Sequence, residues 1–567
     1  MESIVIGVLA LLAIAGAAWL GPRVRIAAPL ILVLVGIAVS LWPSTPIFEV
    51  DPEWILAGIL PPLLFSAAVS LPTTEFRRDF AAISGLAVML VVITSFVIGW
   101  ILSRIIPDLD FAAGLAIGAI LSPTDAVATS IVKRLGVSPR TVVVLEGESL
   151  LNDASALVLL RTAIGATAAG ISLLHIAGAF VYSIVIAVVI GAVVGYGNLW
   201  IRSRATDPTV NTALALTVPF LASLPAEWME ASGLVAAVVA GLITGFMGPR
   251  YLPPRFRLSD RQNWRMIEFI LEGAVFLIMG LELDWVLEDV QEDHFGIAKA
   301  FEYALIALVL TVVIRALYIV PLVYLFRTSS DRATRVANAF QHRFVEPISE
   351  HEFNLKFWGR GKQSDEETIA RFRKTWRRRA ADIDYYRHEQ MGWRQGTVIV
   401  WAGMRGAVTL AAAQTLPRDT PSRSLLVFVA FLVAAMSLLL QGSTLPWLAR
   451  KLLPPGDNNE RADAERARLT VAMRNAGTQV LKEHGLDPDA PFPELVTGPM
   501  PSADSGSLEQ QSRNKQIQLE MIEAQRAVLL AVMDEGTFSS ELISSTMANL
   551  DADQISLEIK GTPATGH

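Results

Sequence analysis

The segment that decides the fold reads Leu145-Glu146-Gly147-Glu148-Ser149-Leu150-Leu151-Asn152-Asp153-Ala154. It lies in an apolar stretch near residues 141–165, which is long enough to cross a bilayer as one helix. Four polar side chains recur here at i, i+1, i+4 and i+5 and so share one helix face: Glu148, Ser149, Asn152 and Asp153. Carboxylate, hydroxyl and amide oxygens suit a hard cation. Glu146 lies on another face, where lining an entrance explains it at least as well as binding an ion.

The composition around this segment is that of a membrane protein. Of 567 residues, 52% are hydrophobic and 18% are charged, whereas soluble domains carry about 25% charged residues. Thirteen apolar spans are predicted, near residues 3–20, 25–42, 53–70, 81–105, 110–135, 141–165, 172–201, 208–224, 232–248, 266–284, 299–326, 395–416 and 424–448. No basic segment precedes the first span, so we expect a retained helix rather than a cleaved signal peptide.

Loop charges predict the orientation of these spans. Loops after spans 1, 3, 5, 7 and 9 carry arginines and lysines, whereas loops after spans 2, 8 and 10 are acidic. Only Arg418 and Arg423, after span 12, go against this alternation. Because basic loops stay on the cytoplasmic side, we expect the N-terminus outside and the C-terminus in the cytoplasm of a plasma (inner) membrane protein.

Two charged blocks are expected to lie in the cytoplasm. Residues 327–394 are inserted between spans 11 and 12 and contain the basic cluster 377–379. Residues 451–567 form a polar tail after a transmembrane domain at 1–450, with helix-like stretches near Glu460–Glu483 and Ser512–Met533. Solvated helices are the plain interpretation of the tail, and regulation or partner docking is the functional one.

Several function classes find no support in the sequence. The chain contains no cysteine, which excludes disulfides and cysteine-based metal sites. The net charge of −7 gives no indication of a nucleic-acid partner. No segment suggests covalent catalysis, so we expect a lipid-embedded transporter without a cofactor rather than an enzyme.

The fifth span contains a helix-breaking motif, Leu121-Ser122-Pro123-Thr124-Asp125-Ala126. Proline removes a backbone donor and clashes with the preceding turn, and the neighbouring hydroxyls can satisfy the freed backbone groups. A locally unwound helix of this kind exposes carbonyls to ions, and Asp125 can neutralise the positive end of a half-helix. The alternative is a simple proline kink with a solvated aspartate.

The twelfth span contains a second such motif, Trp401-Ala402-Gly403-Met404-Arg405-Gly406-Ala407. Glycines flanking a mid-membrane arginine favour another interrupted helix. Spans 5 and 12 are seven apart, as expected for inverted repeats whose broken helices meet at the midplane. Alternatively, Gly403 and Gly406 only allow close helix packing.

Charged residues inside spans are costly, roughly 2.5–3.5 kcal/mol each, and therefore pair or mark pathways. Counted at about 1.5 Å per residue, Glu148 matches the depth of Arg315, and Glu272 matches Arg405. Depth does not fix azimuth, so the partners of the two pairs could be exchanged. Pairing leaves Asp153, alongside Asp125, without an obvious cationic partner. Desolvation disfavours the charged form of such a carboxyl group, which can then hold either a proton or a cation.

These motifs resemble the NhaP-type sodium/proton antiporters of the monovalent cation:proton antiporter-1 family. The resemblance rests on the motifs at 122–126, 146–154 and 403–408 and covers approximately residues 1–450. It implies an all-α fold of thirteen helices with inverted repeats and two crossing interrupted helices, a homodimer, and a core domain that moves against a dimerisation domain. The insertion at 327–394 is unusual for the family.

The resemblance also implies roles for individual residues. Asp153 carries the cation and the proton, with Ser149 and Thr124 coordinating and Asn152 stabilising the crossover near Asp125. Glu148 pairs with Arg315. Asparagine followed by a single aspartate resembles the electroneutral branch, which exchanges one cation for one proton, and one free carboxylate agrees with that ratio.

Three classes of function are open to a membrane protein of this kind. We expect a secondary antiporter that exchanges a monovalent cation, with sodium first and lithium or potassium possible, for protons in pH homeostasis. A proton-coupled symporter for an organic solute would need a larger site lined by aromatic residues. A membrane sensor would need a signalling domain in the tail, and residues 454–567 contain no phosphate-binding loop or kinase signature.

Overall fold

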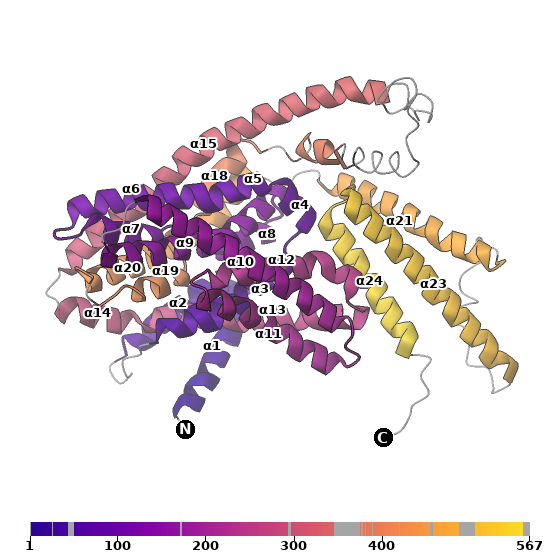
Figure 1. Cartoon of the computed structure of the whole chain (residues 1–567), viewed down its shortest axis with the longest axis horizontal. Helices are drawn as coiled ribbons and strands as arrows, with labels where there is room; N and C mark the ends of the chain where they lie inside the picture. Colours follow the sequence, from indigo (N-terminus) through magenta and orange to yellow (C-terminus); the bar gives the residue numbers. More distant parts are fainter. Residues whose placement is uncertain are drawn as a thin grey trace. The chain divides into compact units, whose positions relative to one another are not determined.

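The computed structural model describes residues 2–24, 26–42, 50–169, 173–292, 296–344, 375, 378–379, 381–387, 389, 391–418, 420–453, 458–486 and 505–559. Within these residues all regular structure is helical (Figure 1). The chain divides into two compact units. The first contains residues 1–251, 260–328 and 391–455, and the second contains 252–259, 329–390 and 456–567.

Seven of the described helices are long and apolar enough to cross a membrane. They are α1 (Glu2–Val24), the run α5 (Phe80–Ser84), η2 (Gly85–Met89) and α6 (Leu90–Ile105), α10 (Leu173–Arg202), α11 (Pro208–Trp228), α12 (Gly233–Tyr251), α15 (Ile297–Phe344) and α20 (Arg423–Leu452). The large apolar side chains that α1 and α10 expose fit contact with lipid.

The remaining predicted spans fall on helices that are short, interrupted or charged. These are α2 (Ala28–Ser40), η1 (Trp54–Ile59) with α3 (Leu60–Ser70), α7 (Phe111–Ile120) with α8 (Val127–Arg134), α9 (Pro139–Ala169), α13 (Pro254–Leu281), and α18 (Trp393–Trp401) with α19 (Ala407–Gln414). Two short helices, α4 (Thr73–Arg78) and α14 (Leu283–Glu292), complete this unit. Among the described residues each of the thirteen predicted spans therefore contains helical structure, with breaks at 121–126 and 402–406.

Both predicted interruptions are present. Helical structure stops after Ile120 and resumes at Val127, and it stops again after Trp401 and resumes at Ala407. In the first gap Pro123 cannot donate a backbone hydrogen bond. In the second gap the backbone of Gly406 is extended, and α19 begins directly after it. A simple proline kink is thus excluded for residues 121–126.

Close helix packing buries the first interrupted helix. α7 lies beside α6 and α9 (Figure 1). A Cβ at Gly114 would lie 2.5 Å from the Gly99 carbonyl oxygen, and a Cβ at Gly118 would overlap the Ser95 carbonyl oxygen. Small residues at these positions let the two backbones touch. Residues 113–121 are consequently all buried.

The second unit contains three tail helices that lie side by side, α21 (Asn458–Glu483), α23 (Ser505–Glu535) and α24 (Ser540–Ile559). Five buried apolar side chains form their core: Leu469, Ile522, Leu529, Met547 and Leu550. The sequence predicted the first two helices and missed α24.

A carboxylate on α24 holds two arginines within the same unit. Asp551 accepts hydrogen bonds from Arg257, which belongs to the first turns of α13, and from Arg526 on α23 (3.0 Å). Burial, with the nearby Arg257 charge, lowers the pKa of Arg526. The tail helices therefore hold the segment at which α13 begins.

Only part of the expected basic insertion at 327–394 lies within the described residues. α15 continues to Phe344, well past the predicted end of its span. Most of residues 345–390, including part of the basic cluster 377–379, lie outside the described residues.

Candidate ion-binding site

The two interrupted helices meet at Asp125. Its backbone N–H donates to the Met404 carbonyl over 2.7 Å, and its carboxylate accepts from the Val127 N–H at 2.8 Å, where α8 begins. A Cβ at Gly406 would overlap this carboxylate. The crossing therefore needs glycine at position 406, because only a residue without a side chain leaves room for Asp125.

α9 is tied to the same crossing through Thr124. The Ser149 hydroxyl donates to the Thr124 carbonyl (2.9 Å) and the Asn152 amide donates to the Thr124 hydroxyl (2.5 Å). That hydroxyl in turn donates weakly to Glu148, at 3.4 Å. The unwound backbone of residues 121–126 is thus held by side chains of the α9 face that the sequence predicted.

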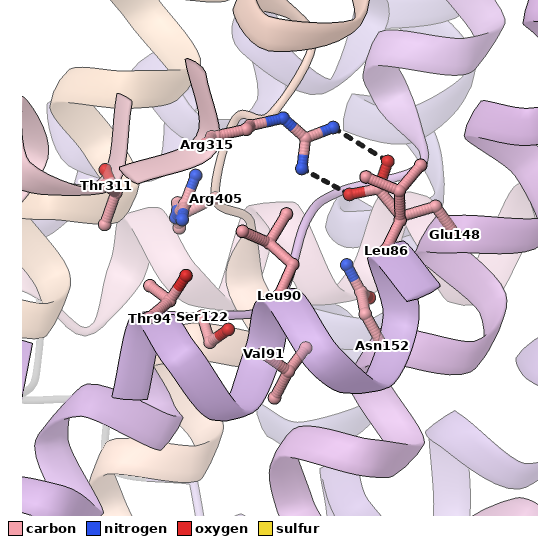
Figure 2. A pocket seen from close by; sticks show the side chains of 10 residues that line it. All are labelled: Leu86, Leu90, Val91, Thr94, Ser122, Glu148, Asn152, Thr311, Arg315 and Arg405. Atoms are coloured by element: carbon pink, nitrogen blue, oxygen red, sulfur yellow. Dashed lines mark hydrogen bonds and ion pairs between the residues drawn. The ribbon is translucent and has the colours of Figure 1, made fainter. Parts of the chain in front are cut away.

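Glu148 and Arg315 form a buried ion pair between α9 and α15. Both guanidinium Nη atoms donate to the carboxylate, with an Nη2–Oε2 distance of 2.8 Å (Figure 2). The two side chains are 1% and 3% exposed. Arg315 also donates from Nε to the Ile399 carbonyl (3.0 Å), so one arginine links α9, α15 and α18.

The expected pair of Glu272 with Arg405 does not form between these two described residues. Arg405 instead donates from Nε to the Leu121 carbonyl (2.7 Å) and from Nη1 to the Gly403 carbonyl. Its charge lies in electrostatic range of Glu148 and Arg315. The prediction was wrong because depth alone placed Arg405. Backbone carbonyls in the unwound segments accept the hydrogen bonds of Arg405, in place of the expected carboxylate.

Asp153 lies one position beyond Asn152 and is 8% exposed. Within the described part of the chain its carboxylate has no hydrogen bond or ion pair, and its electrostatic neighbour is Asp125. Ser149 lies on the same face of α9 as Asp153, and its hydroxyl donates to the Thr124 carbonyl in the first crossing. Together these groups offer a carboxylate, a carbonyl and a hydroxyl to a monovalent cation.

A small cavity lies between η2, α6, α9, α15 and the two crossings, and Asp153 is not among the residues that line it. Polar ends from several elements line it, as Figure 2 shows: Thr94, Ser122, Glu148, Asn152, Thr311, Arg315 and Arg405. The buried Asn152 Oδ1 has no hydrogen-bond partner among the described residues. A cavity lined by such groups can take a water molecule.

Two polar contacts were not predicted from the sequence, and the first of them lies at the site. The Ser437 hydroxyl on α20 accepts from the Arg405 N–H (2.9 Å), which braces the second crossing. Asp79 and Arg140 form a buried ion pair between the start of α5 and α9 (2.7 Å). Arg140 belongs to the basic loop that follows span 5. An acid directly before an apolar span was the available signal for its partner.

Glu146 lies in a partly exposed ion pair. It pairs with Lys133 on α8 at 3.0 Å, and the two side chains are 22% and 64% exposed. Glu146 is thus apart from the buried face that carries Asp153.

Comparisons with known proteins agree with this geometry. Residues 7–451 match the family model described as sodium/hydrogen exchanger, transmembrane. An uncharacterized Na(+)/H(+) exchanger of Mycobacterium tuberculosis is 27% identical over 95% of this chain and 93% of its own length. The Na(+)/H(+) antiporter ApNhaP of Aphanothece halophytica is 26% identical over 94% and 91%.

The fold also has a solved counterpart. The sodium proton antiporter MjNhaP1 from Methanocaldococcus jannaschii aligns with 80% of this chain and 100% of its own, with a TM-score of 0.55 and 16% identity. At that identity the likeness shows the fold alone. The family match extends over most of the chain, including both interrupted helices and α9. The chain therefore belongs to the transmembrane sodium/hydrogen exchanger family.

Proposed function

We propose that this chain is a secondary antiporter that exchanges a monovalent cation, sodium in the first place, for protons. One observation carries the proposal: among the described residues Asp153 is a buried carboxylate without a cationic partner, and its electrostatic neighbour Asp125 lies in an unwound helix segment. Cation and proton compete for this carboxylate, and that competition couples their opposite movements. The relatives named as Na(+)/H(+) antiporters support sodium as the cation.

The residues around Asp153 have different proposed roles. Asp153 holds the cation or the proton, and Ser149 with the Thr124 carbonyl supplies further oxygens. Asn152 keeps the crossover in place through the Thr124 hydroxyl. Asp125 stabilises the start of α8. None of these roles requires a bound cofactor.

The Glu148–Arg315 pair is proposed to be structural. Its charges cancel in the membrane interior, so neither carries a transported ion. Of the three carboxylates at the crossing, Glu148 is committed to arginine and Asp125 to the α8 start, which leaves Asp153 for exchange. This supports a ratio of one cation to one proton, and hence an electroneutral cycle.

Assembly and location extend the same proposal. We infer a homodimer in the plasma (inner) membrane, in which a core domain containing the crossing moves against a dimerisation domain during alternating access. The N-terminus lies outside, and the C-terminus with the 327–394 insertion lies in the cytoplasm. The alternation of basic and acidic loops supports this orientation.

The tail at 451–567 is proposed to be regulatory. Its helix α24 holds Arg257 through Asp551, and Arg257 lies at the beginning of α13. A tail that binds the start of a membrane helix can favour one position of that helix over another.

The function is tested in everted vesicles, which present their cytoplasmic face to the medium. Dissipation of a preset pH gradient is followed on adding sodium, lithium or potassium. Wild type is expected to dissipate the gradient and Asp153→Asn is not, because an amide cannot exchange a proton. Undiminished exchange in Asp153→Asn would overturn the proposal. Collapsing the membrane potential is expected to leave the rate unchanged, and a clear dependence would contradict the electroneutral ratio.

A further inference from the structure

The two half-helices that leave the crossing differ in exposure. α8 and α19 are each eight residues long, and in the proposed orientation α8 runs towards the cytoplasm and α19 towards the outside. α8 follows the partly exposed Asp125 and the exposed Ala126, and its last two residues are exposed. By contrast, residues 402–407 and 409–414 are all buried. The structure is therefore closed along α19.

α9 is closed on the same side. Residues 152–160, which lead from Asp153 towards the outer end of this helix, are all buried. Beyond them Arg161 donates to Glu227 at the end of α11 over 3.3 Å, and these two side chains are 57% and 26% exposed. Along this described stretch, Asp153 is thus shut off from the outer end of its own helix.

Polar atoms are nevertheless buried in α19. Among the described residues, neither side-chain amide atom of Gln414 has a hydrogen-bond partner, and the Thr409 hydroxyl has none either. The two residues are 6% and 0% exposed. A buried polar group without a partner is costly, and its presence in a folded protein needs an explanation. An apolar side chain at either position would avoid this cost.

Water would satisfy these atoms if α19 became exposed on its outer side. Transport by alternating access requires that the site open to each side in turn. Exposure of α19 would let water donate to the Gln414 carbonyl oxygen and accept from its amide nitrogen. The two polar residues therefore disfavour the closed arrangement and favour an open one, because a group that is solvated in only one state shifts the equilibrium towards that state.

The neighbour of α19 at which such an opening can occur is η1. α19 packs against α7, α20 and η1. Residues 113–121 of α7 are all buried, whereas residues 56–59 of η1 are only partly buried. A Cβ at Gly58 would have only the ring of Trp54 within 4 Å. η1 is also a π-helix, a form that is frequent at functional sites. The contact between α19 and η1 is therefore the one with space beside it.

We propose that α19 lines the outer access path of Asp153, and that Thr409 and Gln414 are the polar groups that a monovalent cation passes between α19 and η1. This assignment rests on the proposed function and orientation. The hydroxyl and amide oxygens replace part of the hydration shell of the cation in the open arrangement. In the closed arrangement they have no partner, and this cost keeps the outer side able to open.

Thiol labelling tests whether the path opens. The chain contains no cysteine, so single-cysteine variants need no altered background. Thr409→Cys and Gln414→Cys in right-side-out vesicles are treated from outside with a small cationic thiosulfonate that does not cross the membrane. Labelling is expected to become at least about tenfold faster when a sodium gradient drives exchange, because a minor conformation is populated at about 10% or less without it. Ala413→Cys, 0% exposed on the same helix, is the control and is expected to stay unlabelled.

The face of labelling gives a second control. In everted vesicles the same reagent reaches only the cytoplasmic face, and labelling of Thr409→Cys and Gln414→Cys is expected to stay slow. The reagent is also applied without a sodium gradient on both sides, which gives the rate for the closed arrangement.

Gln414→Leu separates an access role from a structural one. Leucine is close to glutamine in size but has no amide, so the closed arrangement no longer carries the cost of an unpartnered group. The melting temperature is expected to rise by about 1–4 °C, while exchange slows about fivefold or more. The apparent KM for sodium is expected to rise on the outer face and not on the cytoplasmic face. Gln414→Asn keeps the amide and is expected to exchange at a near wild-type rate.

Three results would overturn the assignment. The first is labelling of both cysteine variants no faster than that of Ala413→Cys during exchange. The second is fast labelling from the cytoplasmic face alone. The third is a Gln414→Leu variant that melts below wild type and exchanges at the wild-type rate. If Gln414→Leu does not fold, the labelling decides. Loss of exchange in Asp153→Asn would still support the antiporter function in each case, so the two proposals fail separately.

Discussion

Removing one partner of the Glu148–Arg315 pair is expected to damage stability far more than cation affinity. Breaking a buried ion pair costs about 3–5 kcal/mol, because one charge stays buried without its partner. After Arg315→Ala, the Glu148 carboxylate keeps Arg405 in electrostatic range. The loss of stability is therefore expected near the lower limit, about 3 kcal/mol, or roughly 100-fold in the folding equilibrium.

The reverse substitution is expected to cost more. Glu148→Ala leaves Arg315 and Arg405, two cations in electrostatic range of each other, without an anion between them. Its cost is expected near the upper limit, about 5 kcal/mol. The double variant is expected to be more stable than the sum of the two losses predicts, since neither charge is then left behind.

The assay is thermal unfolding of detergent-purified protein, with the half-life at a fixed temperature as a second measure and the sodium KM as a third. Both single variants are expected to melt below wild type, Glu148→Ala lowest, and properly folded protein is expected to keep a near-normal KM. Wild-type melting of Arg315→Ala together with a KM changed tenfold or more would refute the structural role of the pair.

Three further predictions concern the crossing, the competition and the tail. Gly406→Ala is expected to abolish exchange because its Cβ overlaps the Asp125 carboxylate, whereas Gly197→Ala, with open space around it, leaves vesicle exchange unchanged; an active Gly406→Ala would contradict the described crossing. In the acidic range the apparent sodium KM is expected to rise about tenfold for each unit by which the pH falls, because one proton competes with one cation for the site. A KM independent of pH would exclude a shared site. Asp551→Asn is expected to speed amide hydrogen exchange in α24, because Arg257 and Arg526 lose the negative charge and one of the two acceptor oxygens, at a cost of about 1–3 kcal/mol. The exposed Asp553→Asn is expected to have no such effect, and equal protection in both variants would show that this contact does not hold the tail.

Local chemistry made much of the fold predictable. Pro123 and the glycines around Arg405 mark their interruptions by what they do to their own helix, so no tertiary information was needed. Spacing alone placed Glu148, Ser149, Asn152 and Asp153 on one helix face. The first three of these side chains contact Thr124 or Arg315 in the structure.

Azimuth and long-range packing made the rest unpredictable. Arg405 and Glu272 match in depth but face different neighbours, because helix rotation does not follow from hydropathy. Ser437 is one serine in an apolar helix, and nothing in the sequence distinguishes it as a brace for the Arg405 backbone. The amphipathic pattern of α24 is weak, so its packing on α23 appears only in the structure.

Proton release on cation binding tests the shared use of Asp153 most directly. Sodium is added to purified protein in a weakly buffered solution containing a pH indicator, with equal melting temperatures of wild type and Asp153→Asn as the control for folding. Wild type is expected to release about one proton for each cation bound, and Asp153→Asn none. Equal proton release from Asp153→Asn would contradict competition of cation and proton for this carboxylate.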